Sequence, residues 1–113
     1  MIAYRRGDVV LVNFIFSDES ATKRRPAVIL SSSAYQQGRD GVIIAAITST
    51  TDRILVGDHL IDKWQEAGLL YPSVATGIIR TIKSTMIDRK LGTLKTQDIS
   101  AIDRQLRLSL DLL

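Results

Sequence analysis

The sequence predicts a single α+β domain, in which a strongly bent antiparallel sheet is followed by one C-terminal helix. Two observations favour this fold class. Before Thr96, at least five short apolar stretches alternate with polar or glycine-containing turns. After Thr96, apolar residues recur at spacings of three and four, as they do in an amphipathic helix. The length of 113 residues, without repeats or linkers, favours one domain over residues 1–113.

The first three strands are predicted at Asp8–Phe14, Pro26–Leu30 and Val42–Thr48. The first alternates partly, and its residues on one face are Val10, Val12 and Phe14. The polar segment before the second strand lacks helical periodicity and is predicted to be a loop. Proline is then the first residue of the second strand, a position where a missing N–H is tolerated. The third stretch is apolar almost throughout, so we expect a central strand with both faces covered. The segment SSSAYQQGRDG between them favours turns, with room for one short helical turn.

The middle of the chain predicts shorter elements. His59–Ile61 is expected to be a short strand, and Lys63–Leu69 a helical turn closed by Gly68. Ser73–Ile82 is predicted to be a strand whose internal glycine marks a bulge. The stretch TMIDRKLGTL is expected to form a pair of short elements broken at Gly92.

The C-terminal helix is predicted to begin at Thr96, which is a suitable N-cap residue. Asp98 falls in the first turn, where the helix dipole favours an acid. The apolar stripe of this helix consists of Ile99, Ile102, Leu106, Leu110 and Leu113. Leu108 and Leu112 lie off the stripe and predict a second apolar contact, either within the fold or with a partner subunit.

Composition excludes several classes of function. The chain has no cysteine, which removes disulfides, thiolate nucleophiles and cysteine-based zinc sites and suits a reducing cytoplasm. His59 is the single histidine, so paired-histidine ribonuclease chemistry and histidine-rich metal sites are excluded, and a structural or surface role is expected for it. No export signal and no apolar run of membrane-spanning length is recognised. The acidic pairs Asp18/Glu19 and Asp58/Asp62 lack a metal-binding pattern and are expected to be solvated loop acids.

The segment TKRRPAVIL places three cations directly before a proline and an apolar strand. The net charge of +3 permits an anionic partner without demanding one. Because Arg25 precedes Pro26, its backbone is restricted to extended conformations, and its guanidinium offers paired donors for phosphate oxygens. The alternative reading of the three cations is an ordinary solvated loop. If the first three strands are neighbours, Arg25 and Thr48 share one end of the sheet.

The segments RGDVVLVNF, KRRPAVILSS, AAITS and RKLGTL, in this order, resemble the MazF/PemK-like toxins of type II toxin–antitoxin systems. The resemblance covers nearly the whole chain. It implies an SH3-like barrel with a terminal helix, a homodimer, and sequence-specific cleavage of single-stranded RNA without a metal or other cofactor. It also implies neutralisation by a cognate antitoxin protein and a cytoplasmic location.

The resemblance also implies the site. The family's catalytic arginine precedes the proline of the second strand and corresponds to Arg25, and its catalytic threonine follows the third strand and corresponds to Thr48. Some relatives carry an acid in the preceding loop, which makes Glu19 the candidate general base, with Asp18 behind it. Arg80 corresponds to a basic position that contacts RNA, although relatives often have glutamine where this chain has Ile78. Three further residues are expected to bind RNA rather than catalyse: Lys23, Arg24 and Ser49.

Two other functions remain open from the sequence. The first is a gyrase poison of the CcdB type, which shares the fold but depends on a tryptophan and a glycine near its C-terminus. This chain ends RLSLDLL, with no tryptophan nearby. The second is a nucleic-acid-binding barrel without catalytic activity.

Overall fold

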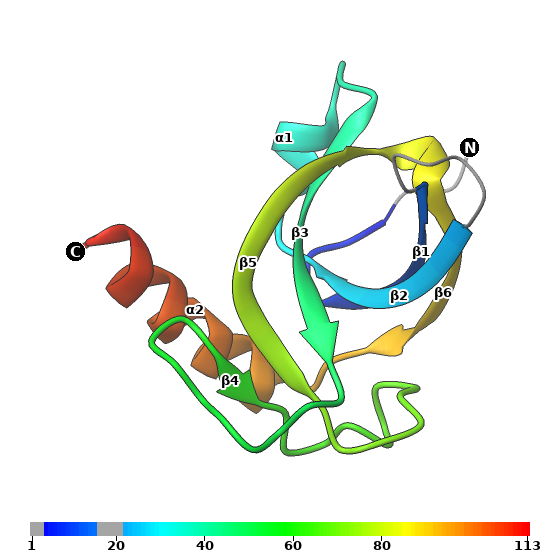
Figure 1. The fold of residues 1–113 in the computed structure, drawn as a ribbon. Coiled ribbons are helices and arrows are strands. Elements are labelled where there is room, and N and C mark those ends of the chain that lie inside the picture. The colour runs from blue at the N-terminus through cyan, green and yellow to red at the C-terminus, as the bar shows by residue number, and fades with distance from the viewer. Residues whose placement is uncertain (1–3, 16–21) are drawn as a thin grey trace.

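The computed structural model describes residues 4–15 and 22–113, whose arrangement is shown in Figure 1. The elements in chain order are β1 (Asp8–Ile15), β2 (Thr22–Ile29), α1 (Ser33–Gln36), β3 (Gly41–Thr48), β4 (His59–Leu60), β5 (Val74–Lys83), the 3-10 turn η1 (Ser84–Met86), β6 (Ile87–Thr93) and α2 (Thr96–Leu110). The described residues form one six-stranded sheet in the order β4-β5-β3-β2-β1-β6. All neighbouring strands are antiparallel. The predicted α+β class, a bent sheet with a C-terminal helix, is therefore confirmed.

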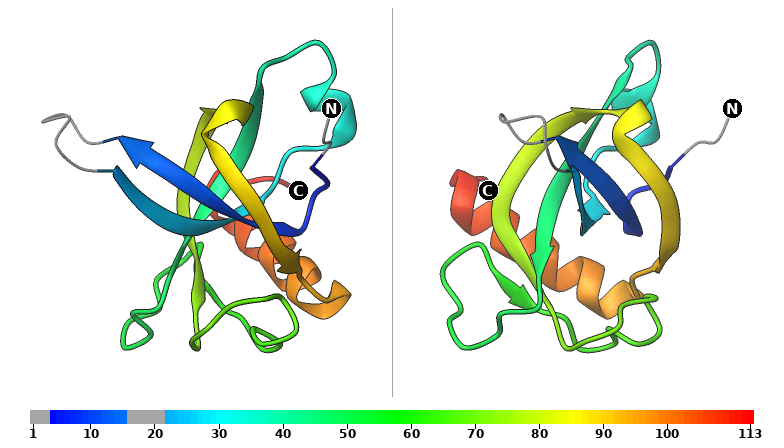
Figure 2. Two further views of the ribbon diagram at one scale, coloured as in Figure 1. Left: turned by 90° about the vertical axis from the view of Figure 1, so that its right-hand side faces the viewer. Right: turned by 45° about the vertical axis from the view of Figure 1, so that its right-hand side comes forward.

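The sheet curls far enough to bring separated strands together across its concave side. The guanidinium of Arg80 on β5 lies over the ring of Phe14 on β1, 5.1 Å from the ring centroid, although β3 and β2 lie between these strands. Figures 1 and 2 show the same curvature, with α2 lying outside the curved strands. The sheet is barrel-like without closing, because β4 and β6 remain edge strands.

Two apolar clusters occupy the two sides of the sheet. The cluster on the concave side, which we call the inner core, contains Val10, Val12, Ala27, Ile29, Val42, Ile44, Ile82 and Ile87, with Tyr4, Phe14 and Met86 packed against it. The second cluster lies on the α2 side and contains Val9, Val28, Ala45, Ile47, Ile61, Ala67, Leu69, Ala75, Leu94 and Ile102. Because β1, β2 and β3 contribute to both clusters, these strands are buried on both faces. The prediction of a central third strand is confirmed, since β3 pairs with both β2 and β5.

Strand β2 begins earlier than the sequence predicts. It starts at Thr22, so Pro26 lies inside the strand and Arg24 and Arg25 belong to the strand rather than to a loop. These early residues pair only with β1, whereas pairing with β3 covers Ala27 to Ile29. Proline is tolerated here because it lies where pairing with β3 begins, so that a missing N–H removes no bond within that ladder.

Two further boundaries differ from the prediction. Strand β6 runs through Gly92 without a break. The N-cap of α2 is Lys95, which has extended backbone angles and makes no side-chain cap, and Thr96 is the first helical residue. The apolar stripe of α2 packs against the sheet only as far as Leu106, and Leu110 at 55% exposure points to solvent.

Other expectations for the middle of the chain hold. The segment 63–69 forms a hydrogen-bonded turn that ends at Gly68, in which the Leu69 N–H donates to the Trp64 carbonyl. Gly77 lies opposite the register shift between Ala45 and Ile47, which is the predicted bulge in β5. Within the described residues, no helix combines the length and apolar character that crossing a membrane requires.

Gly68 is predicted to be the glycine least tolerant of substitution. It has a φ of +84°, and an added Cβ would collide with the Leu91 carbonyl oxygen on β6. Gly38 has a similar φ of +73°, but nothing lies near its Cβ position. We expect Gly68→Ala to lower the free energy of unfolding by about 3 kcal/mol and Gly38→Ala by about 1 kcal/mol, since only the first adds a backbone collision to the conformational cost. Urea unfolding of both variants checks this, and equal losses would contradict it.

Candidate functional site

Arg25 and Thr48 lie on neighbouring strands, each two residues beyond the last Cα pair of β2 with β3. Strands β2 and β3 pair Ala27 with Ala46 and Val28 with Ala45. The pairing ends at Ala27 and Ala46, and the same register continued by two residues would bring Arg25 opposite Thr48, at the end of the sheet where β3 finishes. Directly opposed residues point to the same face of a sheet. The expectation that these two residues share one end of the sheet is therefore met by the strand register.

The face they share is the concave one. On β1, Val12 is the partner of Arg25 and belongs to the inner core. The side chain of Arg25 is exposed, so it extends this face beyond the apolar residues into solvent. Alternation along β2 puts Lys23 on the same face and Arg24 on the opposite one. Arg24 forms an ion pair with Asp88 of β6 at 3.7 Å.

Arg80 reaches the same concave face from β5. Its Cα partner on β3 is Ile44, an inner-core residue. Its guanidinium lies over the ring of Phe14, a cation–π contact. Lys23 is the Cα partner of Phe14. The structure thus gathers Lys23, Arg25 and Arg80 around one concave surface, with Thr48 at its end.

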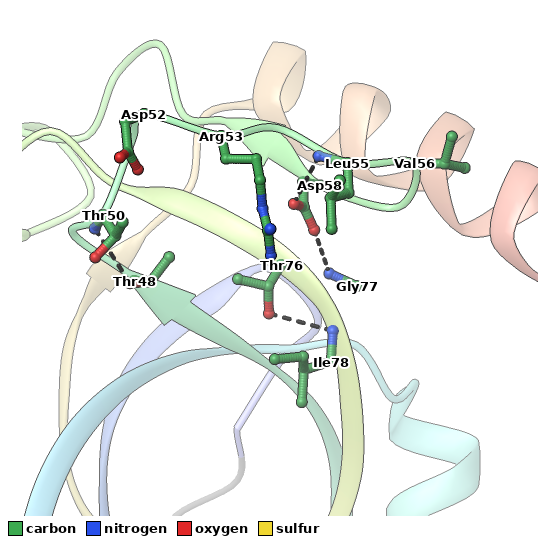
Figure 3. A pocket seen from close by; sticks show the side chains of 10 residues that line it. All are labelled: Thr48, Thr50, Asp52, Arg53, Leu55, Val56, Asp58, Thr76, Gly77 and Ile78. Atoms are coloured by element: carbon green, nitrogen blue, oxygen red, sulfur yellow. Dashed lines mark hydrogen bonds between the residues drawn. The ribbon is translucent and has the colours of Figure 1, made fainter.

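Thr48 is held by a local hydrogen bond. Its Oγ1 accepts from the backbone N–H of Thr50 at 3.1 Å, which leaves the hydroxyl hydrogen free to donate. Thr48 also lines a cavity of about 570 Å³ formed by the β3–β4 loop and β5, drawn in Figure 3. Ser49 points elsewhere and lines a separate hollow of about 340 Å³ with Thr51, Tyr71 and Pro72.

Asp58 fixes the shape of the larger cavity. Its two carboxylate oxygens accept hydrogen bonds from the backbone N–H groups of Leu55 and Gly77, each at 2.9 Å (Figure 3). The backbone N–H of Gly57 donates to Gln105 of α2 at 2.9 Å. The loop is therefore tied both to β5 and to the helix. Asp58 has a structural role here, rather than that of a merely solvated acid.

The cavity also contains two charged residues that the sequence did not single out, Asp52 and Arg53. They follow the end of β3 in the polar run TSTTDR, which carries no periodicity. Glu19 and Asp18, the candidate base and the acid beside it, lie outside the described residues.

His59 has a structural partner, in agreement with the expectation for a lone histidine. Its Nε2 lies 2.7 Å from Oδ1 of Asp98, whose side chain is only 1% exposed. The Asp98 carboxylate also accepts from the backbone N–H groups of Asp62 at 2.9 Å and Lys63 at 3.0 Å. Asp98 therefore joins β4 and the following turn to the first turn of α2, a role beyond the favourable dipole contact that the sequence predicts.

The pKa of Asp98 makes this junction sensitive to acid. Burial raises the pKa of the carboxyl, but the hydrogen bonds from Asp62, His59 and Lys63 outweigh it, so the pKa is lowered overall. A lowered pKa means that Asp98 contributes stability above its unfolded-state pKa of about 4, and that this stability is lost as pH falls through the folded-state value. We expect Asp98→Asn to be less stable than the wild type at pH 7, and the difference to shrink below about pH 4. Urea titrations across this range test it, and a difference independent of pH would contradict it.

Comparisons with known proteins agree with this geometry. Residues 5–110 match the family model described as PemK-like, MazF-like toxin of type II toxin-antitoxin system. The structure is similar to a MazE-MazF complex from Deinococcus radiodurans, with a TM-score of 0.84, 16% identity and 100% of both chains covered. It is similar to an endoribonuclease in complex with its cognate antitoxin from a mycobacterial species, with a TM-score of 0.79, 21% identity and 98% of both chains covered.

A third similar structure is the Mycobacterium tuberculosis toxin MazF-mt6, with a TM-score of 0.76, 25% identity, and coverage of 94% of this chain and 98% of that one. No curated protein matches the chain. The family match extends over almost the whole chain, and the fold agrees with the solved toxin structures over nearly their whole length. The chain belongs to the PemK-like, MazF-like toxin family of type II toxin–antitoxin systems.

Proposed function

We propose that this protein is an endoribonuclease that cleaves single-stranded RNA, mRNA above all, at short defined sequences without a metal ion. The observation that carries the proposal is that Arg25 on β2 and Thr48 on β3 lie at the same end of the sheet, toward a concave face that also presents Arg80. Similar toxins of the family are described as endoribonucleases, which supports the same class of activity here. We propose a cytoplasmic location, in keeping with an mRNA substrate.

RNA supplies its own nucleophile in this reaction. The 2′-oxygen attacks the adjacent phosphorus, a new O2′–P bond forms, and the P–O5′ bond breaks. The proton of the 2′-hydroxyl passes to a base, and the departing 5′-oxygen receives a proton, which gives a 2′,3′-cyclic phosphate and a 5′-hydroxyl. The enzyme must therefore orient the attack and stabilise the charge that builds up on the phosphate.

Arg25 and Thr48 suit the second task. Arg25 offers a rigid pair of N–H donors for the phosphate oxygens in the transition state. The hydroxyl oxygen of Thr48 accepts from the Thr50 N–H through a lone pair. The hydroxyl hydrogen of Thr48 is not used in this bond and can donate to a non-bridging phosphate oxygen. Arginine is a poor proton acceptor, since its pKa lies above ~12. We therefore propose Glu19 as the general base, with Asp18 as the alternative.

RNA binding is proposed to follow the concave face. Lys23 and Arg80 share the face of Arg25 and suit contacts to the RNA backbone. Ser49 lines the neighbouring hollow, and we propose that it contacts RNA there. Arg24 lies on the opposite face of β2 and is paired with Asp88, so we assign it a weaker, electrostatic contribution to affinity.

We further propose a homodimer and a cognate antitoxin, in keeping with the family. The end of α2 and the residues that follow it expose four apolar side chains that could meet a second copy: Leu108, Leu110, Leu112 and Leu113. An uncovered apolar cluster of this kind is typical of a protein–protein interface. We expect the double variant Leu108→Asp/Leu112→Asp to elute as a monomer in size-exclusion chromatography with light scattering. Leu70→Asp, at a site 81% exposed but outside the helix, should leave the dimer intact, and a dimer in the double variant would contradict the proposed interface.

The proposed activity is tested by incubating the purified protein with long single-stranded RNA in the presence of EDTA and mapping the new 5′ ends. Cuts at a short recurring sequence are expected. Loss of cleavage on adding EDTA would contradict the metal-independent mechanism. RNA that is bound but left intact would instead favour a nucleic-acid-binding barrel without catalysis.

A further inference from the structure

The cavity beside Thr48 contains charged groups that the fold itself does not use. Asp52 and Arg53 line it, and neither forms a hydrogen bond or ion pair with any residue in the described part of the chain. In Figure 3 both side chains extend from the β3–β4 loop, and Arg53 points across the cavity toward Thr76 of β5. These two residues are therefore free to contact a ligand in the cavity.

Two other polar residues of the wall, Thr76 and Asp58, have partners within the protein. Thr76 Oγ1 donates to the Ala46 carbonyl at 2.7 Å and accepts from the Ile78 N–H at 3.2 Å. Asp58 has both carboxylate oxygens occupied by backbone N–H groups. Because Asp58 also ties the loop to β5, it holds the backbone that carries Asp52 and Arg53. The two free charges thus project from a braced loop into a preformed cavity.

The apolar part of the wall comes from Leu55, Val56 and Ile78, which are at least half exposed. A ligand here needs a flat apolar face to cover these side chains and a polar edge to meet one carboxylate and one guanidinium. A lone phosphate has no such face, and the Asp52 carboxylate would repel it. A volume of about 570 Å³ is in the range of small-molecule sites and exceeds what one amino-acid side chain fills.

We propose that this cavity holds a nucleobase next to the cleaved phosphate and that Asp52 and Arg53 select guanine there. The inference rests on the ribonuclease function proposed above. Unpaired RNA bases are recognised by packing of the ring face together with hydrogen bonds to the base edges. Arginine pairs with the O6 and N7 acceptors of guanine. A carboxylate accepts from the N1–H and the exocyclic amine of the same base, so guanine alone among the four bases satisfies both residues.

The position of Thr48 links the cavity to the reaction. Thr48 lines the cavity and lies at the same end of the sheet as Arg25, the residue proposed to bind the cleaved phosphate. A base seated against Ile78 and Val56 therefore belongs to a nucleotide immediately before or after the scissile phosphate.

The first test is cleavage of a random-sequence RNA library, with the cut ends sequenced. The wild type is expected to cut with guanine at one of the two positions that flank the break. Asp52→Asn and Arg53→Met should each reduce that preference by about 5- to 100-fold, the factor that corresponds to loss of one bidentate base contact, while cutting of other sequences continues. Arg104→Met, an exposed position on α2 away from the cavity, should leave the preference unchanged.

The second test does not depend on catalysis. Fluorescence anisotropy is measured with uncleavable 2′-deoxy pentanucleotides that carry G, A, C or U at the central position. The inference is supported if the wild type binds the guanine oligonucleotide more tightly than the others and Asp52→Asn loses this preference. A failure to cut any RNA would overturn only the proposed ribonuclease activity and not this inference. The inference would be overturned if all four oligonucleotides bound equally, or if both cavity variants kept the guanine preference. The cavity would then be expected to bind a protein partner instead.

Discussion

Replacing Arg25 with alanine is expected to lower the rate of RNA cleavage by about 100- to 1,000-fold, the usual cost of losing one donor that stabilises transition-state charge. Arg25 is exposed on β2, and its Cα partner on β1 is Val12, so the truncation leaves the core intact. The loss should therefore appear in kcat at an unchanged thermal midpoint. Single-turnover cleavage of a short RNA, measured beside thermal unfolding, checks both.

Arg24→Ala is the matched control for this variant. The two arginines are adjacent in sequence, but alternation along β2 puts them on opposite faces, and Arg24 is paired with Asp88. Arg24→Ala should change cleavage by less than about tenfold, and mainly through a weaker salt-dependent affinity. A larger loss from Arg24→Ala than from Arg25→Ala would contradict the assignment of the concave face. Arg25→Lys should recover only part of the rate, because lysine lacks the paired donors.

Thr48→Val is expected to have the second largest effect on catalysis. The substitution keeps the branched shape at the end of β3 but removes the hydroxyl that can donate to the phosphate. It also removes the acceptor of the Thr50 N–H, whose 3.1 Å hydrogen bond holds the start of the loop. We expect kcat to fall by about 100-fold, within the range for removal of one oxyanion donor. The measurement is the same single-turnover assay.

Thr48→Ser distinguishes the hydroxyl from the shape of the side chain. Serine retains both the donor and the acceptor for Thr50 and should keep cleavage within about tenfold of the wild type. Ser49→Ala tests the neighbouring residue, which lines a different hollow. If Ser49→Ala abolished cleavage while Thr48→Val did not, the catalytic hydroxyl would belong to Ser49.

Local patterns in the sequence were sufficient to predict the sheet and that Arg25 and Thr48 lie toward the same end of it. The apolar run of β3 revealed a strand buried on both faces, and the proline after Arg25 pointed to an extended backbone. Together they brought Arg25 and Thr48 to one end of the sheet. The register of Ala27 to Ile29 with β3, which follows from the pairing that the buried faces require, is consistent with this placement.

The features that escaped prediction depend on contacts between distant segments. Strand β2 continues through its three cations because β1 pairs with them, although their polarity resembles a loop. Gly92 lies within β6, and the backbone of Ala67 packs against it. Asp98 is the buried acceptor for a turn more than thirty residues earlier in the chain. Asp52 and Arg53 belong to a loop that lies beside β5, to which Asp58 ties it by a hydrogen bond from the Gly77 N–H.

The central claim, that Arg25 and Thr48 assist attack by the RNA's own 2′-hydroxyl, is tested most directly by one substrate pair. An RNA oligonucleotide containing the mapped cut sequence is compared with the same oligonucleotide carrying a single 2′-deoxy nucleotide on the 5′ side of the cut, both in EDTA. The account predicts that the first is cut to a 2′,3′-cyclic phosphate and a 5′-hydroxyl, and that the second is bound but remains intact. Cleavage of the deoxy-substituted substrate at the same bond would contradict it.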